Sequence, residues 1–417
     1  MSTSLHTRPT PAAPAWTPGD WRRAPAAQQP AWPYEPAVAA VRRELAALPG
    51  LVTASETYTL RRELARAAQA RAFVVQAGDC AETFDGPDPA RLEARIDLFR
   101  TVCRTIGDAL GMPVVPVGRI AGQYAKPRSS PVELVDGVEL PSFRGHLVND
   151  PEPVAALRAP DPDRMRRGYE HAAATLGLLR SSSAYGNTMR GHWGTGTPAV
   201  WTSHEALLLD YEEPLVRRDC DSDDWVLTST HLPWIGERTR RPDGAHVRFL
   251  SGIVNPVGCK VGPATTPEDL LAVCAALDPG RQPGRLTLIA RMGADEVARR
   301  LPGLVAAVAR AGHPVLWMCD PMHGNTVQAP TGHKTRHMAA VLAELEGFFT
   351  AVRGAGGWPG GIHLESTAEA VTECVGGACG ITEEDLPHHY ATACDPRLNG
   401  DQTREVARHV AALAHRP

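Results

Sequence analysis

Residues 314–325, PVLWMCDPMHGN, bring a thiol, a carboxyl group, an imidazole and an amide together at the end of a short apolar run. Four consecutive apolar residues, 315–318, are typical of a strand in a parallel sheet that is covered on both faces. Pro321 cannot continue a hydrogen-bond ladder and Gly324 loosens the backbone, so the strand must end here. Parallel α/β proteins build their sites at such carboxyl ends. The stretch indicates either a site or a polar loop with a hydrogen-bonded His323.

The same arrangement recurs along the chain. Eight short apolar runs each end at or just before one residue that could do chemistry: Cys80, Arg119, Glu205, Glu237, Lys260, Arg291, His323 and Glu365. In a barrel of parallel strands these ends meet on one face. Scattered surface charges would not follow this rule, so the sequence predicts a single catalytic mouth.

One group within this set suits a metal ion. It consists of Cys80, His323 and Glu365, with Asp395 in ACDPRLN (393–399) as a further candidate. A thiolate, an imidazole and carboxylates together favour borderline divalent ions such as Mn²⁺, Co²⁺, Fe²⁺ or Zn²⁺. His363 shares a strand face with Glu365 and competes for the role of ligand. Taken singly, Cys80 is more often a small core residue and His323 a satisfied loop histidine.

A second group is cationic. Its members are Arg119, Lys126, Arg128, Arg238, Lys260 and Arg291. Six cations in one mouth would repel each other unless an anionic ligand or acidic partners neutralise them, and guanidinium groups match phosphate and carboxylate geometry. The group therefore indicates a substrate with several negative charges. The alternative for each cation is an ion pair with Glu237, Glu205 or Asp320.

Lysine is rare in this chain. Of the 43 basic residues, only Lys126, Lys260 and Lys334 are lysine. A chain that uses arginine almost everywhere else indicates that these three positions need a compact ammonium group, or that lysine survives there by chance.

The elements that must position these residues alternate between short apolar runs and helical periodicity. The runs cover residues 72–80, 113–120, 198–205, 232–240, 255–263, 285–293, 314–325 and 360–366. Eight such runs separated mostly by helical segments predict an α/β fold, a TIM (β/α)8 barrel.

Three segments make up the predicted domain organisation. Residues 1–20 form a flexible Pro-rich N-terminus, residues 21–71 a helical extension, and residues 72–417 the (β/α)8 barrel catalytic domain. In the extension we expect one helix that is closed by Gly50 and a second that is capped by Ser55.

Composition excludes several classes of protein. The net charge of -4 favours neither a nucleic-acid nor an anionic-membrane partner, and no apolar stretch is long enough to span a bilayer. The N-terminus lacks the apolar region of a signal peptide. Nine scattered cysteines fit neither a disulfide framework nor a CxxC zinc site, so we expect a reduced, cytoplasmic protein.

The motifs carry a resemblance to a known family. QAGDCAETF, RIAGQYAKPRS, WIGERTR, NPVGCKVGP, RMG, CDPMHGNT, GGIHLE, AVTECVGG and ACDPRLN closely resemble the class II 3-deoxy-D-arabino-heptulosonate 7-phosphate (DAHP) synthases, over residues from about Gln28 to Leu413. The resemblance implies a metal-dependent barrel that condenses phosphoenolpyruvate with erythrose 4-phosphate in the first step of the shikimate pathway.

The resemblance also implies roles for residues. The metal ligands would be Cys80, His323, Glu365 and Asp395, holding one divalent ion, for which we expect Mn²⁺ with Co²⁺, Fe²⁺ or Zn²⁺ as alternatives. Phosphoenolpyruvate would contact Arg119, Lys126, Lys260 and Arg291, with Glu237 and Arg238 at its edge. Erythrose 4-phosphate would contact Arg128, Ser129 and Arg238. Lys126, Glu237 and His323 would be catalytic.

The chain departs from the family pattern at three places. Ala77 stands where the family usually has a second glycine, which we expect to change only packing. His146 stands where the family has an aspartate, and segment 181–200 is short where longer relatives insert an inhibitor-binding helix pair. We therefore expect no feedback inhibition at that site and a role in secondary metabolism. An amino-DAHP synthase that uses an imino sugar phosphate is the alternative, and an inactive barrel acting as a regulatory partner is the alternative from another class. The family further implies a homo-oligomer (dimer or tetramer); a chorismate mutase partner is not indicated.

Overall fold

The computed structural model describes residues 16–86, 88–135, 137–181 and 200–414. Eight parallel strands close into a barrel in the order β1-β2-β5-β8-β9-β10-β11-β14 and back to β1. Their bounds are β1 Phe73–Gly78, β2 Val114–Arg119, β5 Trp201–Glu205, β8 Leu232–Ile235, β9 Val257–Val261, β10 Leu286–Ala290, β11 Leu316–Cys319 and β14 Pro359–Glu365. Each overlaps one of the eight predicted runs, so the predicted barrel is confirmed.

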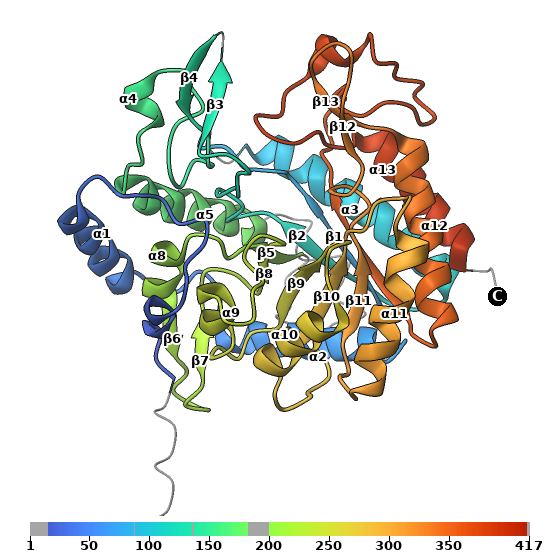
Figure 1. Ribbon diagram of the computed structural model, residues 1–417, viewed down its shortest axis with the longest axis horizontal. Coiled ribbons are helices and arrows are strands. Elements are labelled where there is room, and N and C mark those ends of the chain that lie inside the picture. Colours follow the sequence, from blue (N-terminus) through green and yellow to red (C-terminus); the bar gives the residue numbers. More distant parts are fainter. Residues whose placement is uncertain (1–15, 87, 136, 182–199, 415–417) are drawn as a thin grey trace, which may run out of the picture.

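Helices surround the barrel (Figure 1). The larger ones between or after the barrel strands are α3 Pro89–Leu110, α5 Asp163–Ser181, α9 Ala245–Leu250, α10 Pro267–Leu277, α11 Val297–Arg310, α12 Met338–Gly354 and α13 Gly400–Ala414. The last of these, α13, packs against α3, the first barrel helix. No helix in the described ranges is both long enough and apolar enough to cross a membrane.

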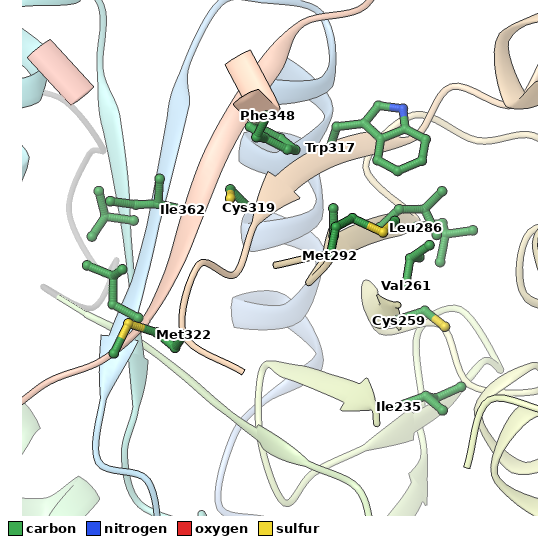
Figure 2. Packing of buried hydrophobic residues seen from close by; sticks show 14 of the residues in the cluster. Ile235, Cys259, Val261, Leu286, Met292, Trp317, Cys319, Met322, Phe348 and Ile362 are labelled. Carbon is green, nitrogen blue, oxygen red and sulfur yellow. The ribbon is translucent and has the colours of Figure 1, made fainter. Parts of the chain in front are cut away.

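The side chains of the barrel strands alternate between an outward and an inward layer. Outward side chains such as Cys259, Trp317 and Ile362 join the helices in the larger core (Figure 2). Inward side chains such as Val117 and Met318 fill the barrel itself. Because side chains change face at every residue of a strand, the inward position nearest the carboxyl end of each strand is fixed by register.

The amino end of the barrel is closed by a helix. Helix α2 (Ala54–Ala68) places Leu60, Leu64 and Ala67, all fully buried, against the inward side chains of the barrel. It contacts β1, β11 and β14. The opposite, carboxyl end is where the loops that carry the predicted site residues begin.

Two expectations about the N-terminal extension are wrong. Helix α1 (Glu35–Ala47) ends before Gly50, because Leu48 precedes Pro49 and takes an extended conformation. The N-cap of α2 is Thr53 and not Ser55. Thr53 and Glu56 form a capping box, in which each side chain accepts the backbone N–H of the other residue.

In the described part of the chain, three hairpins extend the loops between barrel strands. They are β3 (Val132–Val135) with β4 (Val138–Pro141), β6 (Val216–Arg218) with β7 (Trp225–Leu227), and β12 (Thr326–Gln328) with β13 (Lys334–Arg336). Short helices complete the connections: α4 Ala155–Arg158, α8 Leu209–Glu212, η2 Glu213–Leu215 and η3 Leu386–His389. The chain from Trp16, through η1 (Asp20–Arg23), packs at the outside of the barrel, where Trp16 meets Trp225 at 6.2 Å between ring centroids. Residues 1–15 of the predicted flexible N-terminus lie outside the described ranges.

Gly78 is required where β1 meets β2. Its φ is +145°, and a Cβ at this position would lie 2.6 Å from the backbone oxygen of Arg119. The two residues are directly paired at the carboxyl ends of their strands, and Gly78 lies two residues before Cys80. Only glycine lets these two strand ends approach each other without strain.

Replacing Gly78 with alanine should therefore lower the free energy of unfolding by roughly 2 kcal/mol or more. Chemical denaturation followed by circular dichroism measures this. Gly303→Ala is the matched control: Gly303 lies in α11 and a Cβ there meets no atom within 4 Å, so the variant should be neutral or stabilised by ~1 kcal/mol. Equal stability of the two variants would contradict this account of Gly78.

Candidate active site

Glu365 lies at the centre of the polar groups at the carboxyl end of the barrel. It ends β14, faces inward and has no exposed surface. Its Oε1 atom is 3.0 Å from Arg119 Nη2, 3.4 Å from Lys126 Nζ and 3.2 Å from His323 Nε2. Burial alone would raise the pKa of Glu365, but His323, Lys126 and the neighbouring guanidinium groups hold the pKa well below its ordinary value. The carboxylate is thus held charged inside the protein.

Three of the four predicted metal ligands form a compact cluster. One donor atom each from Cys80, Glu365 and Asp395 lies within 4.8 Å of the others. The backbone N–H of Asp395 donates to Cys80 Sγ at 3.2 Å, and Asp395 Oδ2 lies 3.8 Å from the same sulfur. Burial raises the pKa of the Cys80 thiol well above its ordinary value, and the two carboxylates act in the same direction. A thiolate here therefore requires an added cation, which fits a metal site.

His323 joins this cluster through Glu365. Its Nε2 atom faces Glu365 Oε1, and its Nδ1 atom is 2.8 Å from Asp320 Oδ2. Asp320 is fully buried and also accepts the backbone N–H of Met322 and of His323. A carboxylate on one ring nitrogen orients the other nitrogen, as in many metal-binding histidines. The cluster can hold a divalent ion between a thiol and two carboxylates, with the imidazole of His323 next to one of those carboxylates.

His363, the competing candidate ligand, is engaged elsewhere. Its Nδ1 atom lies 2.7 Å from Gln76 Oε1 and its Nε2 atom lies 2.6 Å from Arg119 Nη1. Burial and the nearby Lys260 and Arg119 lower the pKa of His363 far below its ordinary value. A neutral imidazole in these contacts buttresses Arg119 and does not belong to the compact donor cluster.

The buried cations of the mouth have carboxylate partners in this structure. Arg119 and Lys126 contact Glu365, Lys126 also lies 3.3 Å from Asp395 Oδ2, and Lys260 forms an ion pair with Asp320. Arg291 instead donates from Nη2 to the backbone oxygen of His323 at 2.6 Å. The alternative of ion pairing is thus correct for Lys260 and Asp320, whereas Arg119 and Lys126 pair with the predicted metal ligands.

The remaining predicted contacts lie at the rim. Arg238 is exposed and donates from Nη2 to Ser129 Oγ at 2.6 Å. Arg128 contacts Glu133 of the β3–β4 hairpin. Glu237 Oε1 accepts from Arg240 at 3.0 Å, while its Oε2 atom is buried without a hydrogen-bonding partner among the described residues.

Glu205 is a second carboxyl group with an unpartnered oxygen. Its Oε1 atom is buried without a partner in the described ranges, and burial raises the pKa of Glu205 above its ordinary value. Gly236 and Gly262 make room for the two acids: a Cβ on Gly236 would lie 2.1 Å from Glu205 Oε1, and one on Gly262 would lie 2.8 Å from the Glu237 carboxyl carbon.

Two buried acids that sequence reasoning missed hold the loops of the site. Glu82 accepts the backbone N–H groups of residues 121, 122 and 123, which shapes the loop that leads to Lys126. Glu344 accepts the N–H groups of Met292 and Gly293 and the side-chain amide of Asn325. The sequence holds a sign of each buried acid: Glu82 lies two residues after Cys80, and Glu344 lies among apolar residues of a predicted helix.

His146 packs against two aromatic rings outside the cluster around Glu365. Its ring lies 5.1 Å from Phe84 and 5.3 Å from Phe143, and burial lowers the pKa of His146 to about 4. It lines a polar cavity of about 290 Å³ behind Asp79. Of the described residues that line this cavity, none belongs to the predicted substrate contacts.

Comparison with known proteins shows which family this chain is similar to. The model of the class-II DAHP synthetase family matches residues 16–195 and 182–411. Phospho-2-dehydro-3-deoxyheptonate aldolase of Streptomyces coelicolor is 44% identical over 432 aligned residues, covering 94% of this chain and 96% of that protein. A probable phospho-2-dehydro-3-deoxyheptonate aldolase of Pseudomonas fluorescens is 47% identical over 374 residues, covering 90% and 92%.

A solved structure supports the fold. Phospho-2-dehydro-3-deoxyheptonate aldolase of Francisella tularensis superimposes with a TM-score of 0.54 over 90% of this chain and 96% of that one. The sequence identity is 14%, so this likeness shows the barrel fold alone.

Anion binding at the mouth should weaken above pH 8. Burial lowers the pKa of Lys260 to about 8, with Arg119 acting in the same direction and Asp320 opposing it. The ammonium is therefore charged below this pH and loses its charge as the pH rises through it. Loss of one charged contact corresponds to ~10-fold weaker binding.

Calorimetric titration with sulfate, whose charge is constant between about pH 6 and 10, measures this change. Lys260→Met should bind weakly throughout and show no step near pH 8. A step of the same size in that variant would contradict the assignment to Lys260.

Proposed function

The chain belongs to the class-II DAHP synthetase family and condenses phosphoenolpyruvate with erythrose 4-phosphate to give DAHP and phosphate, and we propose that this reaction takes place at the mouth around Glu365. The observation that carries the site is the convergence of a thiol, an imidazole and two carboxylates with a set of buried cations. A metal-assisted reaction of two phosphorylated substrates needs both groups.

Enzymes of this family depend on a metal ion, and the cluster offers a place for it. We propose Cys80, His323, Glu365 and Asp395 as its ligands. The donor set of one sulfur, one nitrogen and two carboxylates suits a borderline divalent ion. We propose Mn²⁺, which the resemblance to the family implies, with Co²⁺, Fe²⁺ and Zn²⁺ as alternatives. When bound, a divalent ion supplies a Lewis acid that polarises the aldehyde oxygen of erythrose 4-phosphate.

The deep cations are our proposed phosphoenolpyruvate site. Arg119, Lys126 and Lys260 are buried, and Arg291 lies beside them in contact with the His323 backbone. Positive charge that is already fixed in a water-poor site binds a carboxylate and a phosphate without reorganisation. Glu237 and Arg238, from the loop after β8, would contact the same substrate at its edge.

The rim is our proposed site for the phosphate of erythrose 4-phosphate, with Arg128, Ser129 and Arg238 as contacts. The 2.6 Å contact between Arg238 and Ser129 brings the loops after β2 and β8 together at this place. The aldose would then extend from the rim to the cluster, and phosphoenolpyruvate would lie below it with its carbon facing the aldehyde.

Three residues have proposed catalytic roles. Lys126 lies within 3.4 Å of both Glu365 and Asp395, so its charge borders the ligand cluster and the phosphoenolpyruvate site. His323 carries the ligand nitrogen that Asp320 orients. Glu237, whose Oε2 atom is free to accept, would take a proton from the water that attacks the cationic carbon left after carbon–carbon bond formation. Phosphate then departs, with its charge met by arginine and lysine.

Other features of the proposal concern the cellular setting. We propose a cytoplasmic homo-oligomer, a dimer or tetramer, in which α1 and α2 supply interface. Secondary metabolism is the proposed role. The alignment with the Streptomyces coelicolor protein spans 432 positions, which is more than the 417 residues of this chain. The Streptomyces coelicolor protein therefore contains residues that this chain lacks. This supports a short form of the enzyme.

Steady-state turnover tests the substrate assignment. Metal-loaded protein should release phosphate from phosphoenolpyruvate when erythrose 4-phosphate is present, and the keto-acid product should form at the same rate. Cys80→Ala and His323→Ala should each lower this rate by about 100-fold or more. Near-normal activity of both variants would contradict the ligand assignment. Faster turnover of an imino sugar phosphate than of erythrose 4-phosphate would identify an amino-DAHP synthase. No turnover of either sugar phosphate would favour the inactive barrel.

Resistance to feedback inhibition remains a prediction from the sequence. The short segment on which it depends falls mostly on residues 182–199, which are outside the described ranges. Tryptophan should leave the turnover rate unchanged in an assay with both substrates near their KM. Strong inhibition at low tryptophan concentration would show that an aromatic amino acid binds despite the short segment.

A further inference from the structure

The strand β13 presents two cations on one face. Lys334 and Arg336 are two residues apart, so their side chains leave the strand on the same side, while Thr335 between them points the other way. Thr335 is buried and donates from Oγ1 to the backbone oxygen of Glu373 at 2.9 Å. The hairpin β12–β13 belongs to the same loop after β11 that carries His323 (Figure 1).

Each cation contacts a different carboxylate of the ligand cluster. Lys334 Nζ lies 3.1 Å from Asp395 Oδ1. Arg336 Nη2 lies 2.8 Å from Glu365 Oε2, as an ion pair whose angles are not those of a hydrogen bond.

In both carboxylates the other oxygen faces inward. Asp395 Oδ2 lies 3.8 Å from Cys80 Sγ, and Glu365 Oε1 lies 3.2 Å from His323 Nε2. The two oxygens of each carboxylate are therefore divided, one toward the ligand cluster and one toward β13.

The face of β13 is itself anchored. Arg336 is fully buried, donates from Nε to Thr326 Oγ1 of β12 at 3.0 Å, and contacts the backbone oxygen of Pro396, next to Asp395. The hydroxyl of Tyr390 donates to the backbone oxygen of Lys334 at 2.8 Å. Lys334 and Arg336 are thus held by contacts that do not involve the ligand cluster.

We propose that Lys334 and Arg336 are positioning residues of the metal centre. Each holds the outer oxygen of one ligand carboxylate, so that the inner oxygen stays aimed at the ion. This inference rests on the proposed metal site. Outer contacts of this kind restrict the rotation of a ligand and commonly change metal affinity by 10–100-fold. A lysine suits Asp395 because a compact ammonium can contact one carboxylate oxygen and leave the second free. A guanidinium fork, by contrast, tends to engage both oxygens.

An opposite role is physically possible for a cation so near a metal ion. If Lys334 served only to neutralise Asp395, its positive charge would compete with the ion, and its removal would tighten metal binding. The positioning role predicts weaker binding after its removal. The sign of the change therefore separates the two roles.

The experiment is Mn²⁺ binding to the full chain, measured by calorimetry in the absence of substrates. Lys334→Met should weaken Mn²⁺ affinity about 10-fold, while the unfolding midpoint of the metal-free protein stays unchanged. Lys334→Arg should recover only part of the affinity, because a guanidinium fork tends to engage the second oxygen of Asp395 as well. Lys334 is preferred to Arg336 as the test position because its side chain is 50% exposed, so the variant should fold normally.

A matched control removes an equivalent ion pair on a helix that carries none of the proposed ligands. Arg404 on α13 has a side chain 44% exposed and lies 2.9 Å from Asp401. Arg404→Met should leave Mn²⁺ affinity unchanged. Unchanged or tighter binding in Lys334→Met would overturn the positioning role.

Cys80→Ala shows which proposal has failed. If this variant loses Mn²⁺ affinity and Lys334→Met does not, only the positioning role is wrong. If Cys80→Ala binds Mn²⁺ as the wild type does, the ion binds elsewhere and the proposed metal site is wrong together with it.

Discussion

The site depends on keeping one fully buried carboxylate charged. A bare Glu365 at this depth would be neutralised, or would destabilise the fold by several kcal/mol. Arg119, Lys126 and His323 approach one of its oxygens and Arg336 the other. Arg119 ends β2, the other groups come from the loops after β2 and β11, and Glu365 ends β14. One charge thus ties together three loops that are far apart in the sequence, and each loop carries further residues of the site with it.

The same cations have a second use. In the protein without substrates they balance the acids of the mouth, and an incoming anion would find them already in place. Such prior arrangement is the main source of electrostatic stabilisation in enzymes, because no dipole has to reorient during the reaction. It also explains the two buried loop acids. Glu82 and Glu344 satisfy backbone N–H groups that a loop in a water-poor site could not otherwise pair.

The sequence predicted the barrel and the chemistry at its strand ends, since both follow from a two-residue period and from polar residues at the ends of apolar runs. It could not show which acid meets which cation. Lys260 pairs with Asp320 because β9, β10 and β11 are neighbours in the barrel, and this depends on closure. The role of Glu82 depends on the loop conformation, in which Ala121 has a φ of +60°. The true cap of α2 is visible in the sequence, because Thr53 and Glu56 have the spacing of a capping box.

The helix that closes the amino end of the barrel leaves one way in. With Leu60 and Leu64 packed against the interior, both substrates must enter, and product and phosphate must leave, through the carboxyl end. The buried cations lie at the bottom of this passage and the rim arginines at its entrance. A molecule seated at the rim would block the path to the bottom. In the proposed arrangement, phosphoenolpyruvate must therefore bind before erythrose 4-phosphate, and the product that spans both places must leave before the next phosphoenolpyruvate can enter.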